Sequence, residues 1–346
     1  MKSFLARLVL LLSFPVLASA ALQSGKVQVG KISGSVTIAD TASPRQPLVA
    51  GATFGEGSRI ETGMDSTAEL VFSNGASIVL TPNTLLELRT FRQVPSAAIT
   101  DPYRQIEQDP SPSVTEVEVA RGKIIGEVRK LNALSTFTVK TPAGLVRIRG
   151  TVFAIEYRIG PDGMGSIVVS CVRGSVETTV YSCNVGAVLV EPCKQLSAAS
   201  PSAALIARLA DALSPVPAAL LATASQPTRI LVYPIPSEDM SELAALVGAN
   251  STLPPEVAAT IASLVGAMPT RAQIFSGPNG EPDPKIVTII LDKPPGGKPD
   301  KKPPPKPESM TATGGGTTLD ETLKKITDNV ERSVESSQLP VTPVGS

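Results

Sequence analysis

The regular alternation of apolar and polar residues, interrupted by glycine or Asn-Gly, restricts the fold of this chain more than any other feature. In residues 68–72 alanine, leucine and phenylalanine occupy every second position, so they lie on one face of an extended segment. Asn74-Gly75 follows, and both residues tolerate the positive φ of a tight turn. The apolar alternation then resumes at 78–80. This pattern predicts a β-hairpin or the corner of a β-solenoid.

Similar alternating runs recur through residues 26–197, and none of them has the 3.6-residue spacing of a helix. They lie at 27–38, 117–128, 137–139, 145–157, 166–180 and 185–190. Residues 93–114 contain several prolines and few apolar residues, which indicates an insertion loop. We therefore predict one all-β domain at 26–197 with a loop at 93–114.

The composition changes after residue 197. Residues 200–291 are rich in alanine and leucine at helical spacing, which predicts a short helical region. Two apolar strand candidates, 229–233 and 285–291, accompany the helices, and they could pair with each other or be isolated. Residues 292–318 are rich in lysine, proline and glycine, which predicts a disordered linker. Residues 319–346 are predicted to form an amphipathic helix and a tail.

The N-terminus has the pattern of a cleavable secretory signal. Cations at Lys2 and Arg7 precede an apolar run at 8–17, and Ala18-Ser19-Ala20 follows. The run is shorter than the roughly 20 residues that a spanning helix needs. Residues 1–20 are therefore predicted to be removed, and the mature protein is expected in the periplasm or outside the cell, not as an integral membrane protein.

The composition excludes several classes of function. The chain has no histidine and no tryptophan, so it lacks the commonest general base, a common metal ligand and the best ring for stacking on sugars. Lys plus Arg and Asp plus Glu both number 31, so net charge does not favour nucleic acid. No cofactor or metal motif is evident. We expect a protein that is not an enzyme and binds neither cofactor, metal nor nucleic acid.

Three cysteines, Cys171, Cys183 and Cys193, lie within one stretch of the β region. An exported protein can form disulfides, so one pair with one remaining thiol is one interpretation. Three buried, unpaired cysteines are the other, because an odd count without close spacing carries little information.

Two arginines provide the only candidate contact surface in the β region. Arg147 and Arg149 flank Ile148 and therefore project from one face of a strand. They could contact an anion or a partner, or they could belong to a solvated strand face.

Several short motifs, taken in order, resemble the FecR family. They are GEGSRIETG at 55–63, STAELVFSNGASIVL at 66–80, RGKIIGEV at 121–128, FTVKTP at 137–142, GTVF at 150–153 and VRGSV at 172–176. Glycines recur at fixed places in these motifs, where a Cβ would obstruct a corner. We therefore predict structural turns at Gly63, Gly75, Gly150 and Gly174.

The resemblance implies an all-β body that is solenoid-like or sandwich-like. In the regulator members of the family it also implies a cytoplasmic anti-sigma segment, one transmembrane helix and a periplasmic domain that senses an outer-membrane receptor. For this sequence we expect a signal, and not an anti-sigma segment, before the β region. The expected function is therefore an extracytoplasmic binding or scaffold module that docks an envelope protein or glycan. The alternative is a structural envelope component with no discrete ligand.

Overall fold

The computed structural model describes residues 21–40, 44–99, 102–202, 205–207, 228–250 and 255–291. The predicted signal (1–20), linker (292–318) and amphipathic tail (319–346) lie outside these residues. Within them the chain consists mainly of β-strands, as the alternation predicted. No helix in the described part is long and apolar enough to cross a membrane.

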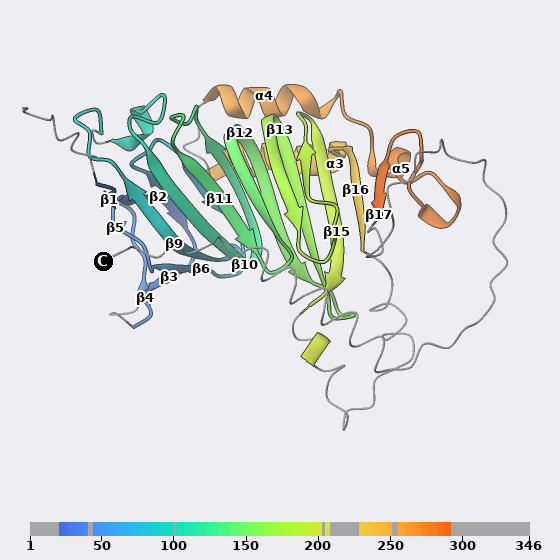
Figure 1. Ribbon diagram of the computed structural model, residues 1–346, viewed down its shortest axis with the longest axis horizontal. Helices are drawn as coiled ribbons and strands as arrows, with labels where there is room; N and C mark the ends of the chain where they lie inside the picture. Colours follow the sequence, from blue (N-terminus) through green and yellow to red (C-terminus); the bar gives the residue numbers. More distant parts are fainter. Residues whose placement is uncertain are drawn as a thin grey trace, which may run out of the picture.

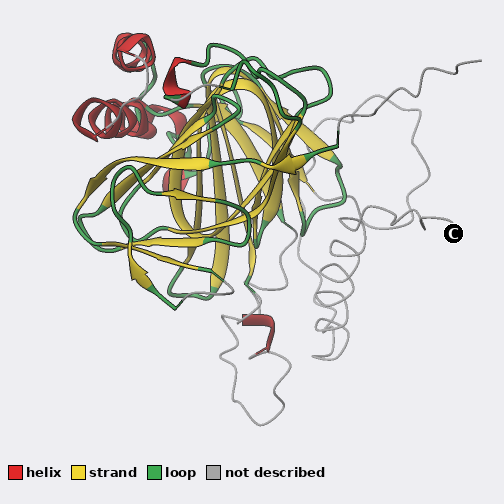
Figure 2. Ribbon diagram, turned by 90° about the vertical axis from the view of Figure 1, so that its left-hand side faces the viewer, coloured by secondary structure: helices red, strands yellow, loops and turns green. Residues whose placement is uncertain are grey.

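The strands form one continuous mixed sheet that folds over on itself into two layers (Figures 1 and 2). Three long strands run through both layers: β10 (Ser113–Val128), β12 (Gly144–Ile159) and β13 (Met164–Val180). The first half of β10 pairs with β11, while its second half pairs with the second half of β12. Each of the strands β10, β11 and β12 thus pairs with the other two. The sheet as a whole is open, and β14 and β17 lie at edges of its described part.

The shorter strands belong to one layer each. The first layer contains β3 (Val36–Ala39), β4 (Gln46–Pro47), β6 (Arg59–Thr62), β9 (Leu85–Gln93), β11 (Thr136–Thr141) and β14 (Ala187–Val190), with β1 (Gln23–Ser24) paired to β9. The second contains β2 (Val27–Ser33), β5 (Thr53–Phe54), β7 (Thr67–Phe72), β8 (Ser77–Leu80), β15 (Lys194–Pro201), β16 (Arg229–Pro234) and β17 (Thr288–Leu291). The fold is all-β and sandwich-like, as expected.

The long strands change layer at glycines. Gly122, Gly150 and Gly174 have φ values of 91°, 63° and 86°, a conformation that favours glycine. Gly75, with φ 84°, turns the chain from β7 to β8. Gly63 differs from this pattern, because its φ is not positive and Asp65, with φ 54°, adopts the left-handed conformation at that corner.

Buried hydroxyl groups hold the corners together. The Oγ1 of Thr62 donates to the carbonyl of Thr81 at 2.7 Å, and the Oγ1 of Thr84 donates to the carbonyl of Lys123 at 3.0 Å. The Oγ1 of Thr151 donates to the carbonyl of Ser175 at 3.0 Å. These bonds give additional partners to backbone carbonyl groups at or beside the bends.

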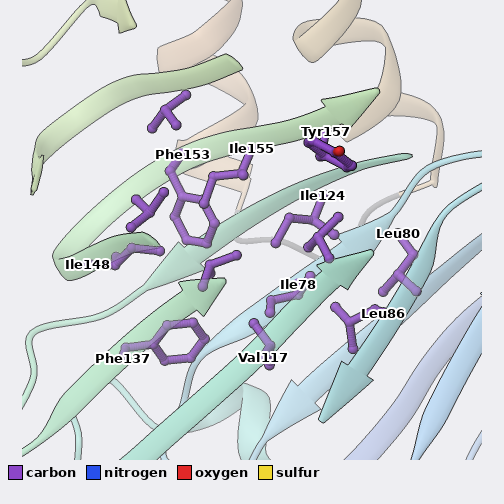
Figure 3. Packing of buried hydrophobic residues seen from close by; sticks show 14 of the residues in the cluster. Ile78, Leu80, Leu86, Val117, Ile124, Phe137, Ile148, Phe153, Ile155 and Tyr157 are labelled. Atoms are coloured by element: carbon purple, nitrogen blue, oxygen red, sulfur yellow. The ribbon is translucent and has the colours of Figure 1, made fainter. Parts of the chain in front are cut away.

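The main core lies between the two layers (Figure 3). Phe72 of the second layer meets Phe91 and Phe137 of the first in edge-to-face contacts, with ring centroids 5.3 and 5.9 Å apart. Phe153 and Ile155 extend this core from β12, and both are fully buried. The inward positions of the alternating runs therefore form one apolar interior, as the sequence pattern requires.

Two helices cover the outer face of the second layer (Figures 1 and 2). They are α3 (Ser237–Asn250) and α4 (Pro255–Val265). Buried residues on this face are Ile125, Val152, Ala154 and Val172, and they pack against Met240, Leu243, Val257 and Ile261 of the helices. A second apolar core thus lies outside the sandwich.

The strands expected at 229–233 and 285–291 are not isolated. They form β16 and β17, which pair with each other, and β16 also pairs with β15. The short helix α5 (Arg271–Ile274) packs against Tyr233 of β16, and the turn η2 (Pro278–Gly280) follows. The described C-terminal segments therefore extend the β body.

The segment predicted as an insertion loop connects β9 to β10, and its described part includes the short turn η1 (Tyr103–Gln105). It lies against β7, where Arg104 forms an ion pair with the buried Glu69 at 2.6 Å. The guanidinium of Arg129 donates to the carbonyls of Ile106 and Arg104 at 2.6 and 3.2 Å. These contacts fix the loop beside the end of β10.

Candidate partner-binding groove

A groove of about 900 Å³ lies where the end of β10, the corners of β12 and β13, and the start of α4 meet. One wall is the loop at 129–135 between β10 and β11, and another is formed by Arg149, Gly150 and Arg173. Glu256 and Val257 of α4 contribute as well. The groove therefore forms only when segments far apart in the sequence come together.

Ion pairs within the groove occupy some of its arginines. Glu127, which is 5% exposed, accepts from Arg173 at 3.0 Å and lies 3.9 Å from Arg129. Arg129 is also committed to the carbonyls of the insertion loop. Pairing satisfies a buried carboxylate that would otherwise be costly. Arg173 and Arg129 are therefore partly neutralised by Glu127.

Arg149 differs from its neighbours. It is exposed at the groove, and none of the ion pairs found in the described part of the chain includes it. A guanidinium presents several donors in a fixed fork that matches a carboxylate. Arg149 is therefore the group in the groove best placed to receive an anionic group from outside.

The rim of the groove is an ordered loop with an apolar tip. The backbone N–H of Asp109 donates to the carbonyl of Lys130 at 3.1 Å, and the Oδ2 of Asp109 accepts from Ser113 at 3.1 Å. Leu134, with 76% of its surface exposed, projects from this loop. A smaller hollow of about 740 Å³ shares the wall 130–133 and continues toward the insertion loop. The surface thus combines a cation with an exposed apolar side chain.

The two arginines expected to share a partner face are only partly brought together. Both are exposed on the outer face of the first layer, but Arg149 lines the groove and Arg147 does not. Arg147 lies opposite Glu177 in the pairing of β12 with β13. The same face carries the ion pairs Lys140 with Glu116 at 3.0 Å and Arg89 with Glu118 at 2.9 Å. Arg147 therefore belongs to a solvated strand face.

Sequence reasoning did not find the other groove residues. Arg173 precedes the corner glycine Gly174, so a motif marked its neighbourhood, but its pairing with Glu127 depends on strand register. The contribution of α4 had no local signal. Within the described ranges, no group of three or more His, Cys, Asp or Glu could hold a metal ion.

Comparison with known proteins identifies the β region. The family model described as FecR protein matches residues 58–177. These residues form a FecR domain. The domain begins just before β6 and ends within β13, so it contains Arg149, Arg173 and the loop at 129–135. The helix α4, β15, β16 and β17 lie beyond it.

Two solved structures are similar to the chain. Both are crystal structures of a candidate anti-sigma factor from Parabacteroides distasonis ATCC 8503, with 18% and 16% sequence identity and TM-scores of 0.28 and 0.29. Each match covers 40% of this chain and 53% of the other, so the match spans about half the length of those proteins. A search of curated proteins gave no match.

Proposed function

We propose that this chain is an extracytoplasmic, non-enzymatic FecR-domain module that binds an envelope protein through the groove beside Gly150. The observation that carries the proposal is Arg149, an exposed guanidinium without an acidic partner in the described structure, at the wall of a groove of about 900 Å³. The N-terminal pattern at 1–20 supports export to the periplasm or beyond. The FecR domain supports a role in envelope signalling.

The lining of the groove favours a protein partner over a glycan. No aromatic residue is among the side chains that line it, so it offers no ring on which a sugar could stack. Arg149 instead fits a carboxylate, and Leu134 at the rim fits an apolar side chain. The partner we propose therefore presents an acidic residue close to an apolar one.

Capture of binding partners from envelope extracts tests this proposal. The wild-type protein serves as bait and is compared with two variants. Arg149→Glu reverses the charge in the groove. Arg158→Glu reverses an exposed arginine near the other end of the same strand, where it pairs with Glu156 at 3.0 Å. We expect the wild-type protein and Arg158→Glu to retain one stoichiometric partner. Arg149→Glu should retain roughly tenfold less, because a like charge would face the partner's carboxylate.

Thermal unfolding shows whether the variants are folded. Arg149→Glu and Arg158→Glu should leave the melting temperature nearly unchanged, as should Arg147→Ala and Arg149→Ala, because exposed charges contribute little to stability. Equal capture by all variants would remove the groove from consideration. Binding to purified cell-wall glycan that survives Arg149→Glu would favour a glycan ligand. Insoluble assembly with no stoichiometric partner would favour a purely structural envelope component.

A further inference from the structure

Two exposed cations of the groove have no acidic partner in the described part of the chain. They are Arg149 and Lys130, and none of the ion pairs found there includes either of them. Their backbones lie close together, because a Cβ added to Gly150 would lie 3.7 Å from the Cα of Lys130. Leu134 projects from the same loop as Lys130, with 76% of its surface exposed. This part of the groove therefore offers two positive charges beside an apolar side chain.

Two acidic side chains reach the groove from other elements. Glu107 of the insertion loop and Glu256 of α4 are both exposed, and no ion pair within the described ranges includes them. Glu127 differs, because it pairs with Arg173 at 3.0 Å. A ligand that complements the groove therefore carries carboxylates next to apolar side chains, with a cation beside them.

The chain itself contains a segment of this kind at residues 319–336, outside the described residues. Glutamate directly follows valine at Val330-Glu331 and again at Val334-Glu335, and Arg332 stands between the two pairs. The whole segment has five acidic and three basic residues, so its net charge is negative. Its charge is therefore opposite to that of the two unpaired cations of the groove.

The spacing within this segment suits a surface contact. The two valines are four positions apart, and so are the two glutamates. On the amphipathic helix predicted here, residues four apart would lie on the same side. An isolated helix of this length is marginal in water. The helix would therefore be stabilised by a surface that receives both its valines and its glutamates.

The predicted linker at 292–318 is long enough to bring this segment to the groove. It has 27 residues, which as a flexible chain would span roughly 30 Å on average and as extended polyproline II about 80 Å. A compact body of the size of residues 21–291 has a radius of gyration of about 18 Å, so its whole surface is within reach. Such a tether gives an effective concentration on the order of 1 mM, which would largely fill a site with a dissociation constant of about 0.1 mM.

We propose that this segment binds in the groove of its own chain. Its two glutamate carboxylates pair with Arg149 and Lys130, and its two valines pack against Leu134. A partner from outside must then displace the segment, which lowers the apparent affinity of the groove for that partner. This regulatory consequence rests on the proposed function, whereas the contact within the chain does not.

Hydrogen exchange of the full mature chain, followed by mass spectrometry, tests the contact. In the wild-type protein the backbone amides of 323–336 should exchange roughly tenfold more slowly than in a free chain, because the tether keeps the segment mostly bound. Arg149→Glu should remove most of this protection, because a like charge would face the glutamates. Arg158→Glu, near the other end of β12 and outside the groove, should leave it unchanged.

A charge swap makes this test specific to the proposed pairs. Glu331→Arg combined with Glu335→Arg should also remove the protection, although arginine and glutamate have similar helix propensities. Adding Arg149→Glu and Lys130→Glu to these two changes should restore it, because the pairs re-form with reversed signs. Exchange at the free-chain rate in the wild-type protein, or protection that survives the reversals, would overturn the proposal.

Carbodiimide cross-linking locates the segment and shows whether one chain or two are involved. The reagent joins an amine to a carboxylate that touches it, so we expect links from Lys130 to Glu331 or Glu335. Lys26, which is exposed but does not line the groove, should give no such link. Equal linking at both lysines would contradict binding in the groove. Links between labelled and unlabelled chains in a mixture would place the segment on a second copy and overturn binding within one chain.

The contact and the proposed function can fail separately. A protected segment without Arg149-dependent capture of an envelope protein would overturn the proposed function alone. Capture that depends on Arg149, by a chain whose segment exchanges freely, would overturn the contact alone. Where both hold, Glu331→Arg with Glu335→Arg should raise the apparent affinity for the captured protein roughly tenfold, because the competing segment no longer fills the groove. Unchanged affinity would overturn the regulatory consequence.

Discussion

Replacing Phe153 by alanine is expected to lower the free energy of unfolding by about 3 to 5 kcal/mol, as large-to-small changes in a packed core do. The ring is fully buried between the two layers (Figure 3). The ring also fills the space beside Gly126, the residue opposite Phe153 on β10, because a Cβ added to Gly126 would lie 2.6 Å from the ring. Urea denaturation followed by circular dichroism measures the change.

A double-mutant cycle makes this prediction specific to the packing. Gly126→Ala alone should destabilise the protein, because the new methyl group meets the ring of Phe153. In the Phe153→Ala background the same change should cost less, since the methyl group enters the vacated space. Leu134→Ala is the control, and it should change the free energy by less than about 0.5 kcal/mol because that side chain is exposed. Additive effects at 126 and 153 would contradict the packing described.

The sequence was sufficient to predict the inward face of the β body. Alternation at 68–72 and at 153–155 identified residues that lie in the main core, because side chains on a strand alternate between its two faces. The same rule failed for Val152 and Ala154. Both are buried although they point outward, since α3 and α4 cover that face of the second layer. A strand buried on both faces loses the alternation on which the prediction depends.

The four glycines predicted to form structural turns differ in backbone conformation. Gly75, Gly150 and Gly174 have positive φ, but at the corner after β6 the left-handed residue is Asp65 and not Gly63. Aspartate tolerates this conformation and carries no unique signal in the sequence. Gly63 lies in the same turn, directly after β6, so the motif marks the turn segment but not its left-handed residue.

The candidate groove was harder to predict, because its walls meet only in the folded chain. Arg149 was identified by its place on a strand face, together with Arg147. The structure separates the two, since only Arg149 lies at the groove. The ion pair of Arg173 with Glu127 joins β13 to β10, strands that are not adjacent in the sequence. Contacts of this kind depend on register, which a single sequence does not reveal.

Gly174→Ala is expected to destabilise the protein by about 3 to 5 kcal/mol, because two costs add at this corner. The first is conformational, since φ is 86° at Gly174 and an L-residue is strained there. The second is steric, since an added Cβ would lie 2.7 Å from the carbonyl oxygen of Gly150. That oxygen is part of the backbone and cannot move away as a flexible side chain would.

Two other glycines separate these costs. Gly186, with φ 77°, has no atom within 4 Å of an added Cβ, so Gly186→Ala should show only the conformational cost, about 1 to 2 kcal/mol. Gly150, with φ 63°, has its nearest contact at 3.7 Å and should resemble Gly186. Chemical denaturation of the three variants measures the difference. Equal losses of unfolding free energy for the variants at 174 and 186 would show that the bends of β12 and β13 are not in contact. A greater loss at 174 would show that the bend of β13 at Gly174 packs against the bend of β12 at Gly150.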